Sequence, residues 1–156
     1  MIQRKQSVFL LLSAIALGFL FYFPMASFIG GNDSLMLYVY QVVSLVPDNT
    51  PDLPTYFVLP VLTLNVLLIL LTVTAIFLYK KRMLQLSLVR INLLLLLVMI
   101  GVFFFYYVHT LEELSGGIAE YETGSYFPLI AFVFYILAYR GIISDERLIR
   151  SADRLR

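Results

Sequence analysis

Lys80-Lys81-Arg82 stands between two long apolar runs, residues 56–79 and 84–108. Each run is close to the roughly 20 residues of helix that cross about 30 Å of hydrocarbon. Three adjacent cations between two such runs are typical of a short turn held at one membrane surface. The triplet therefore predicts two membrane-spanning helices that meet at that surface, and the other segments can be placed relative to this turn.

The composition of the whole chain is typical of an integral membrane protein. The 156 residues are 61% hydrophobic and 13% charged, whereas a soluble domain usually carries about 25% charged residues. The chain has no cysteine, which excludes disulfides, thiolate metal sites and a cysteine nucleophile. The few cations mostly flank apolar segments, so the composition gives no support to nucleic-acid binding.

Two further apolar segments lead to a prediction of four spans. The first follows a short basic lead, is longer than the usual signal-peptide core of about 7–15 residues, and ends without a convincing cleavage site, so we interpret it as retained. The predicted spans are residues 8–29, 56–79, 84–108 and 125–143, joined by loops 30–55 and 109–124 and the turn 80–83, with a tail at 144–156.

The first loop contains a segment that is too short to cross a membrane as a helix. Residues 35–46 are rich in β-branched and aromatic side chains and lie between turn signals, which favours a strand over an interfacial segment. The predicted fold is therefore one all-α membrane domain, residues 1–156. It is a bundle of four transmembrane helices with a possible small extracytoplasmic β-element, to which both loops contribute.

The distribution of cations predicts the orientation of the chain. With the 80–83 turn in the cytoplasm, both termini are cytoplasmic, and the two opposite loops carry no Lys or Arg but seven of the ten acidic residues. The positive-inside rule favours this orientation. The cations on the cytoplasmic side or its interface are Arg4, Lys5, Lys80, Lys81, Arg82, Arg90, Arg140, Arg147, Arg150, Arg154 and Arg156.

Three polar residues within the predicted spans are candidate interhelical or functional residues: Asn65, Arg90 and Asn92. Arg90 follows Arg82 by about 12 Å of helix, so its head group can extend to the cytoplasmic surface. The two asparagines are predicted to make hydrogen bonds between helices. A transport path lined by the three residues is the alternative, although no acidic residue lies within any span to relay protons.

His109, Glu112 and Glu113 come nearest to a metal-binding group, since His109 and Glu113 share a helical face. A zinc site usually needs three or four ligands, and we interpret the group as a solvated acidic loop without a metal. The sequence contains no Ser-His-Asp set or phosphate-binding glycine loop. We therefore expect no catalytic residue, no cofactor and no enzymatic activity.

The tail is predicted to form a separate amphipathic helix on the cytoplasmic side, with Ser144 as its cap. Arg147, Arg150 and Arg154 fall on one stripe, and Leu148 and Leu155 on an adjacent apolar stripe. Such a helix can bind anionic lipid headgroups or a protein partner in the membrane. The alternative is a solvated tail that acts only as a stop-transfer sequence after the fourth span.

The ending, residues 145–156, together with the opening Met1-Ile2-Gln3-Arg4 and the 80–82 turn, resembles a family of four-span inner-membrane proteins from Bacteroidota. The family is described only as a domain of unknown function, and the resemblance covers the full length. Family tails more often have a small residue and a lysine at the positions of Gly141 and Ser144. The resemblance implies a bacterial inner-membrane location and no known activity.

These observations favour a non-enzymatic accessory or scaffold subunit of a larger inner-membrane assembly. Small exposed regions, a tail suited to docking and the lack of a catalytic set support it. A small oligomeric transporter or lipid-binding membrane protein is the alternative, in which Asn65, Arg90 and Asn92 converge inside the bundle. An enzyme that uses His109 with the two glutamates is the third hypothesis.

Overall fold

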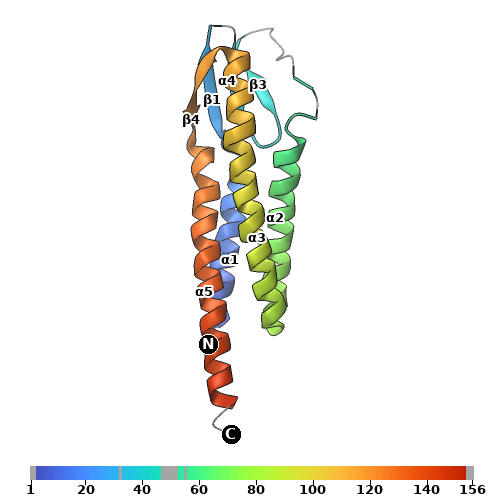
Figure 1. Cartoon of the computed structure of the whole chain (residues 1–156), viewed down its shortest axis with the longest axis vertical. Coiled ribbons are helices and arrows are strands. Elements are labelled where there is room, and N and C mark those ends of the chain that lie inside the picture. The colour runs from blue at the N-terminus through green and yellow to red at the C-terminus, as the bar shows by residue number, and fades with distance from the viewer. Residues whose placement is uncertain (1–2, 32, 47–52, 55, 154–156) are drawn as a thin grey trace.

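The computed structural model describes residues 3–31, 33–46, 53–54 and 56–153, with side chains described from residue 6 to residue 147 of these ranges. Four long helices lie side by side: α1 packs against α2 and α5, and α3 closes the arrangement by packing against the same two helices (Figure 1). The four long helices are α1 (Gln3–Phe19), α2 (Leu59–Phe77), α3 (Arg82–Val102) and α5 (Phe127–Asp153), and the short helix α4 is His109–Ser115.

A four-stranded antiparallel sheet covers one end of the helices, opposite the end where α1 begins and α5 finishes (Figure 1). Its strand order is β3-β2-β1-β4, and β1 pairs with both β2 and β4. The strands are β1 (Ala26–Gly30), β2 (Ser34–Leu37), β3 (Val42–Ser44) and β4 (Gly117–Tyr121).

The prediction of an all-α fold is therefore wrong, because this sheet is part of the fold. Helix α1 ends at Phe19, ten residues before the predicted end of the first span, and residues 26–30 form β1 instead. Pro24 lies between them, and a proline inside a helix removes a hydrogen bond and clashes with the preceding turn. The inner face of β1 is apolar, and Ala26 and Phe28 are fully buried.

Three helices are long and apolar enough to cross a membrane: Leu59–Lys80, Arg82–Ser115 and Thr123–Arg147. This is compatible with a membrane location. The predicted first span is not among the three, because the apolar helix that replaces it, α1, is shorter. The second of the three joins α3 to α4 through the π-helical segment η2 (Phe103–Val108), so residues 109–115 of the predicted loop are helical. Gly116 ends this helix with a φ of 68°, a conformation that glycine adopts at little cost.

The β1–β4 pairing depends on two glycines that face each other, Gly30 and Gly117. A Cβ atom at Gly30 would lie 2.0 Å from the carbonyl oxygen of Ser115, and one at Gly117 would lie 2.2 Å from that of Ile29. The backbone turn after α4 therefore packs directly on β1. This close approach fixes the sheet to the top of the long α3–α4 helix.

The separate C-terminal helix that the tail pattern predicted is also absent from the described residues. Helix α5 runs without a break from Phe127 to Asp153, so Ser144 lies inside it and caps nothing. Every residue from Ala138 to Arg147 is helical, and the apolar sequence before Ser144 continues the turn without a breaker. As a result, α5 projects beyond the α2–α3 turn as one rod (Figure 1).

Candidate functional site: a basic groove below the α2–α3 turn

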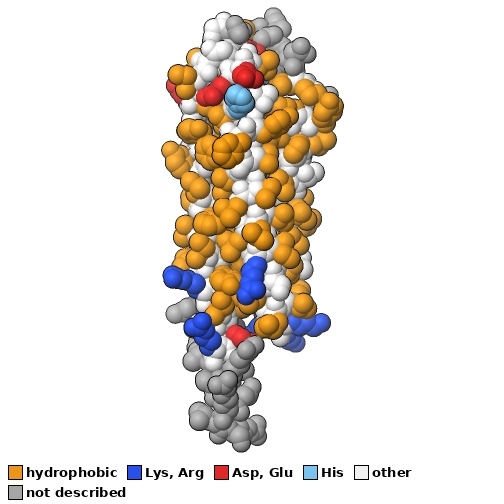
Figure 2. All heavy atoms as spheres, in the orientation of Figure 1, with side chains coloured by type: hydrophobic (Ala, Val, Ile, Leu, Met, Phe, Trp, Pro, Cys, Tyr) orange, Lys and Arg blue, Asp and Glu red, His pale blue; other side chains and the backbone are white. Residues whose placement is uncertain are grey.

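The charged side chains separate along the length of the molecule. Figure 2 shows Lys and Arg side chains toward the end from which α5 projects, the histidine and a group of acidic side chains at the sheet end, and hydrophobic side chains between them. The exposed apolar surface of this middle zone includes Leu70, Leu94 and Val133, which are 59%, 64% and 54% exposed. A lipid-facing surface has this composition.

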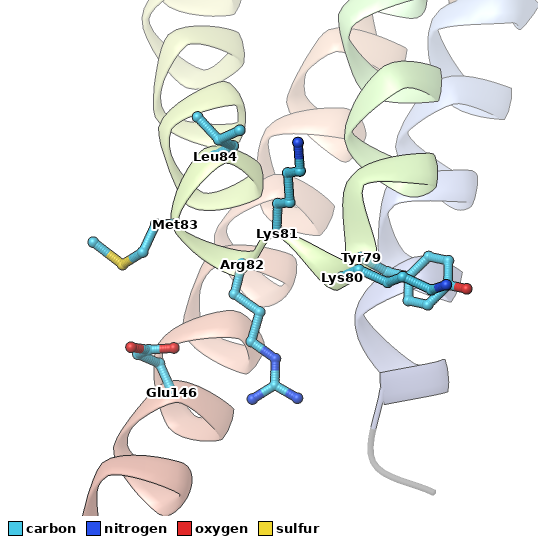
Figure 3. A pocket seen from close by; sticks show the side chains of 7 residues that line it. All are labelled: Tyr79, Lys80, Lys81, Arg82, Met83, Leu84 and Glu146. Carbon is cyan, nitrogen blue, oxygen red and sulfur yellow. The ribbon is translucent and has the colours of Figure 1, made fainter.

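An open groove of about 650 Å³ lies at the basic end, between the α2–α3 turn and α5 (Figure 3). Below we name it the basic groove. Arg82 extends down from the turn alongside α5, while Lys80 and Lys81 leave the turn in other directions (Figure 3). Lys80 Nζ lies 5.9 Å from the centre of the Tyr79 ring. The lining residues are Tyr79, Lys80, Lys81, Arg82, Met83, Leu84 and Glu146.

The turn itself is held by backbone and side-chain hydrogen bonds. After the short 3-10 segment η1 (Leu78–Lys80), the Lys81 N–H donates to the Leu78 carbonyl at 2.9 Å, and the Gln85 N–H donates to the Lys81 carbonyl at 3.0 Å. The buried Gln85 side chain also donates from Nε2 to the Ala75 carbonyl of α2 at 3.0 Å. The groove is thus built on a fixed turn, although its cations sit on long side chains.

Arg82 has a guanidinium nitrogen, Nη1, that is buried and has no hydrogen-bond partner among the described residues. A buried donor of this kind costs free energy unless a ligand satisfies it. Carboxylate and phosphate oxygens are the groups that arginine binds best, because its N–H groups form a planar fork. The groove can therefore bind an anionic group from a lipid or from a protein partner.

A second polar group lies in the interior, centred on Thr72 of α2, which is fully buried. Its hydroxyl donates to the Leu68 carbonyl at 2.6 Å, which leaves its two lone pairs free to accept. Tyr135 of α5 contacts this hydroxyl through its own O–H, and Asn92 of α3 donates to it from Nδ2 at 3.3 Å. One threonine therefore joins three helices across the centre of the bundle.

The three polar candidates of the predicted spans do not converge. Asn65 donates from Nδ2 to the Leu17 carbonyl at 3.3 Å, which satisfies an acceptor near the end of α1. Asn92 lies with Thr72, about 10 Å further along α2. Arg90 is on the outer surface, where its Cζ lies 5.6 Å from the centre of the Tyr139 ring. The Oδ1 atoms of both asparagines are buried without a partner among the described residues.

A buried contact that the sequence does not indicate joins Gln6 of α1 to Asp145 of α5. Both side chains are 6% exposed, and Gln6 Nε2 donates to Asp145 Oδ2. Gly141, one turn earlier on α5, leaves the space that Gln6 fills, since a Cβ there would lie 3.0 Å from Gln6 Cγ. In the sequence Asp145 directly follows Ser144, the cap of the predicted separate helix, and no local pattern indicates Gln6 as its partner.

The three residues that came nearest to a metal-binding group, His109, Glu112 and Glu113, have other contacts. His109 and Glu113 are exposed, and His109 Nε2 lies 3.5 Å from Glu113 Oε1. Glu112 points elsewhere: its Oε1 accepts a 2.9 Å hydrogen bond from the Ala119 N–H of β4. Among the described residues, no group of three or more His, Cys, Asp or Glu side chains could hold a metal ion. Glu112 satisfies an N–H on the outer edge of β4, and such an edge would otherwise be open to another strand.

The predicted docking residues of the tail are described only in part. Arg147 is exposed at the end of the described side chains, one residue after Glu146 of the basic groove. The side chains of Leu148 and Arg150, and the residues Arg154 and Leu155, lie outside the described part. The structure therefore places only the first of these residues, beside the groove rather than on a separate helix.

These features define a class: a small helical protein with helices of membrane-crossing length, a basic groove at one end and an antiparallel sheet at the other. Within this class, the chain belongs to the family described as a domain of unknown function, DUF4293, whose model matches residues 2–155. This confirms the resemblance to a family of unknown function. A comparison with proteins of curated function finds no match.

Proposed function

We propose that the chain is a non-enzymatic accessory or scaffold subunit of a larger assembly in the bacterial inner membrane. In this proposal the helices Leu59–Lys80, Arg82–Ser115 and Thr123–Arg147 cross the membrane, and the shorter apolar helix α1 lies beside them and crosses with them. Both termini are then in the cytoplasm and the sheet is outside. The complete separation of Lys and Arg from the two sheet-forming loops supports the orientation.

The observation that carries the proposal is the basic groove beside the projecting α5. The lining of the groove combines two apolar side chains, Met83 and Leu84, with the buried Nη1 of Arg82, which has no hydrogen-bond partner among the described residues. Protein partners are bound in such places, where an arginine and apolar side chains are desolvated together. The partner is expected to present a carboxylate next to an apolar side chain.

Site-specific photo-crosslinking in cells tests this proposal. A photoreactive amino acid at position 83 lies in the basic groove, where Met83 is 58% exposed. The matched control is position 94 on the same helix, where Leu94 is 64% exposed outside the groove. We expect a discrete protein adduct from position 83 that is absent from position 94 and is lost with Arg82→Glu. Adducts that do not differ between the positions would refute the proposal.

A lipid-binding membrane protein is the second candidate, and the gathering of cations next to exposed apolar helix surface favours it (Figure 2). Anionic headgroups are attracted to such clusters by about 1 kcal/mol per cation. The transport version is less well supported, because Arg90 lies on the surface and does not join Asn65 or Asn92. Adducts of position 83 with lipid alone would favour the lipid-binding candidate.

A further inference from the structure

Arg90 has an unusual position for a charged residue. It lies eight residues after Arg82 on α3, about 12 Å further into the apolar zone. Its neighbours Ile91 and Leu94 are 45% and 64% exposed, so this part of α3 faces lipid if the helix crosses a membrane. A charge here costs free energy unless something balances it.

The Arg90 side chain is held at this depth by α5. Its Cζ lies 5.6 Å from the centre of the Tyr139 ring, which is within the range of a cation–π contact. Tyr139 is seven residues before Glu146, and therefore about 10 Å above the basic groove. The ring thus keeps the guanidinium away from the groove, but a ring carries no net charge and leaves the cation without a counter-ion.

No described acidic side chain stands at the same height. Asp145 and Glu146, the acids that follow on α5, lie about 9–10 Å lower, and Asp145 accepts its hydrogen bond from Gln6. Arg140, which follows Tyr139 directly, is exposed and adds a second cation to this level of α5. The local field is therefore positive and open to the surface.

We propose that Arg90, supported by Tyr139, binds the phosphate of an anionic phospholipid at the seam between α3 and α5. The planar guanidinium can donate two N–H groups to phosphate oxygens, and the apolar residues beside it receive the acyl chains. The acyl chains hold a lipid phosphate next to this seam, whereas free phosphate has no apolar chain to keep it there. The inference rests on a membrane location, but not on a protein partner.

Native mass spectrometry of the purified full-length protein tests the proposal. The protein is released from detergent after equilibration with phosphatidylglycerol or phosphatidylcholine, and the bound lipid is counted. We expect preferential retention of phosphatidylglycerol, and about tenfold weaker retention with Arg90→Gln, as expected from the loss of a charge-assisted hydrogen-bond pair. Inorganic phosphate at millimolar concentration should not displace the lipid.

Matched variants separate a binding role from a structural one. Tyr139→Phe keeps the ring and should bind as the natural protein does, whereas Tyr139→Leu should bind less lipid. Circular dichroism and gel filtration check that each variant is folded. Equal retention of both lipids, an unchanged Arg90→Gln variant, or displacement by inorganic phosphate would overturn the proposal. Crosslinking from position 83 is expected to be unaffected by Arg90→Gln, so failure of this inference can be told apart from failure of the accessory-subunit proposal.

Discussion

Replacing Thr72 by valine tests whether a single hydroxyl holds three helices together. Valine has nearly the shape of threonine, so the buried space stays filled, but the hydroxyl that Tyr135 and Asn92 share is removed. Both partners are then buried without their hydrogen bond, because Tyr135 and Asn92 are each 0% exposed. The bond from Thr72 to the Leu68 carbonyl is lost as well, although that oxygen keeps its place in the helix.

The size of the effect follows from the number of bonds between helices. Side-chain hydrogen bonds in membrane proteins average about 0.6 kcal/mol and reach about 1.7 kcal/mol. Since two such bonds are removed, we expect the free energy of unfolding to fall by about 1–3 kcal/mol. Unfolding of the purified protein in mixed micelles, followed by circular dichroism while the fraction of denaturing detergent is raised, measures this change.

Thr74→Val is the matched control. Thr74 is exposed on the same helix, and its hydroxyl donates only to the Leu70 carbonyl of its own turn, at 2.8 Å. The Thr74→Val change should therefore leave the free energy of unfolding almost unchanged. A double-mutant cycle of Thr72→Val with Asn92→Leu should show less than additive loss, because both changes remove one shared bond. Equal effects of Thr72→Val and Thr74→Val, or strict additivity in the cycle, would refute the reasoning.

Three further changes test the sheet and the basic end. Gly30→Ala places a methyl group 2.0 Å from the Ser115 carbonyl oxygen of α4, so we expect the free energy of unfolding, followed by thermal unfolding, to fall by about 1–3 kcal/mol or more. The control Gly31→Ala should be neutral, because a Cβ there meets nothing within 4 Å. Glu112→Ala removes the acceptor on the edge of β4 and should increase self-association in analytical ultracentrifugation, whereas the exposed Glu113→Ala should not. Gln6→Leu takes the donor from a buried carboxylate and should cost about 1–3 kcal/mol in detergent unfolding; an unchanged midpoint would count against that contact.

The long helices could be predicted from the sequence because hydrophobic length is a local property. Residues 56–79 and 84–108 overlap the helices Leu59–Lys80 and Arg82–Ser115, and the basic turn lies between them as expected. The sequence did not predict where the helix Arg82–Ser115 ends, since the predicted span stops at residue 108. The last residues of this helix are polar and resemble a loop, yet they continue the helix until Gly116, whose positive φ ends it.

The sheet could not be predicted as a whole, because its central pairing joins distant parts of the chain. Strand β1 pairs with β4, and Phe28 lies opposite Ala119. Within each segment the glycines indicate only that a helix stops. Glycine is needed at positions 30 and 117 because the two backbones approach closely there. This contact joins distant segments, so neither segment shows it as a periodic pattern.

The same limit applies to the candidate sites. Asn65 and Asn92 were visible as polar residues in apolar runs, but the sequence could not show that they lie at different heights and that Arg90 points outward. Tyr139 was visible only as an aromatic residue near a membrane interface. Its contact with Arg90 depends on how α3 and α5 are aligned, which the packing of the whole bundle determines.

The location of unsatisfied polar groups argues for ligand binding at the basic end rather than through the centre. In the interior, the donors of Thr72 and Gln85 are used between or within helices. Two buried side-chain acceptors without a partner remain among the described interior residues, on Asn65 and Asn92. They lie about 10 Å apart along the axis, too far apart to form a continuous polar path between them. At the basic end, by contrast, the unpartnered group is a cationic donor, Arg82 Nη1. This donor and the guanidinium of Arg90 would both be satisfied by an anionic group. The ligand expected at the basic end is therefore an anion.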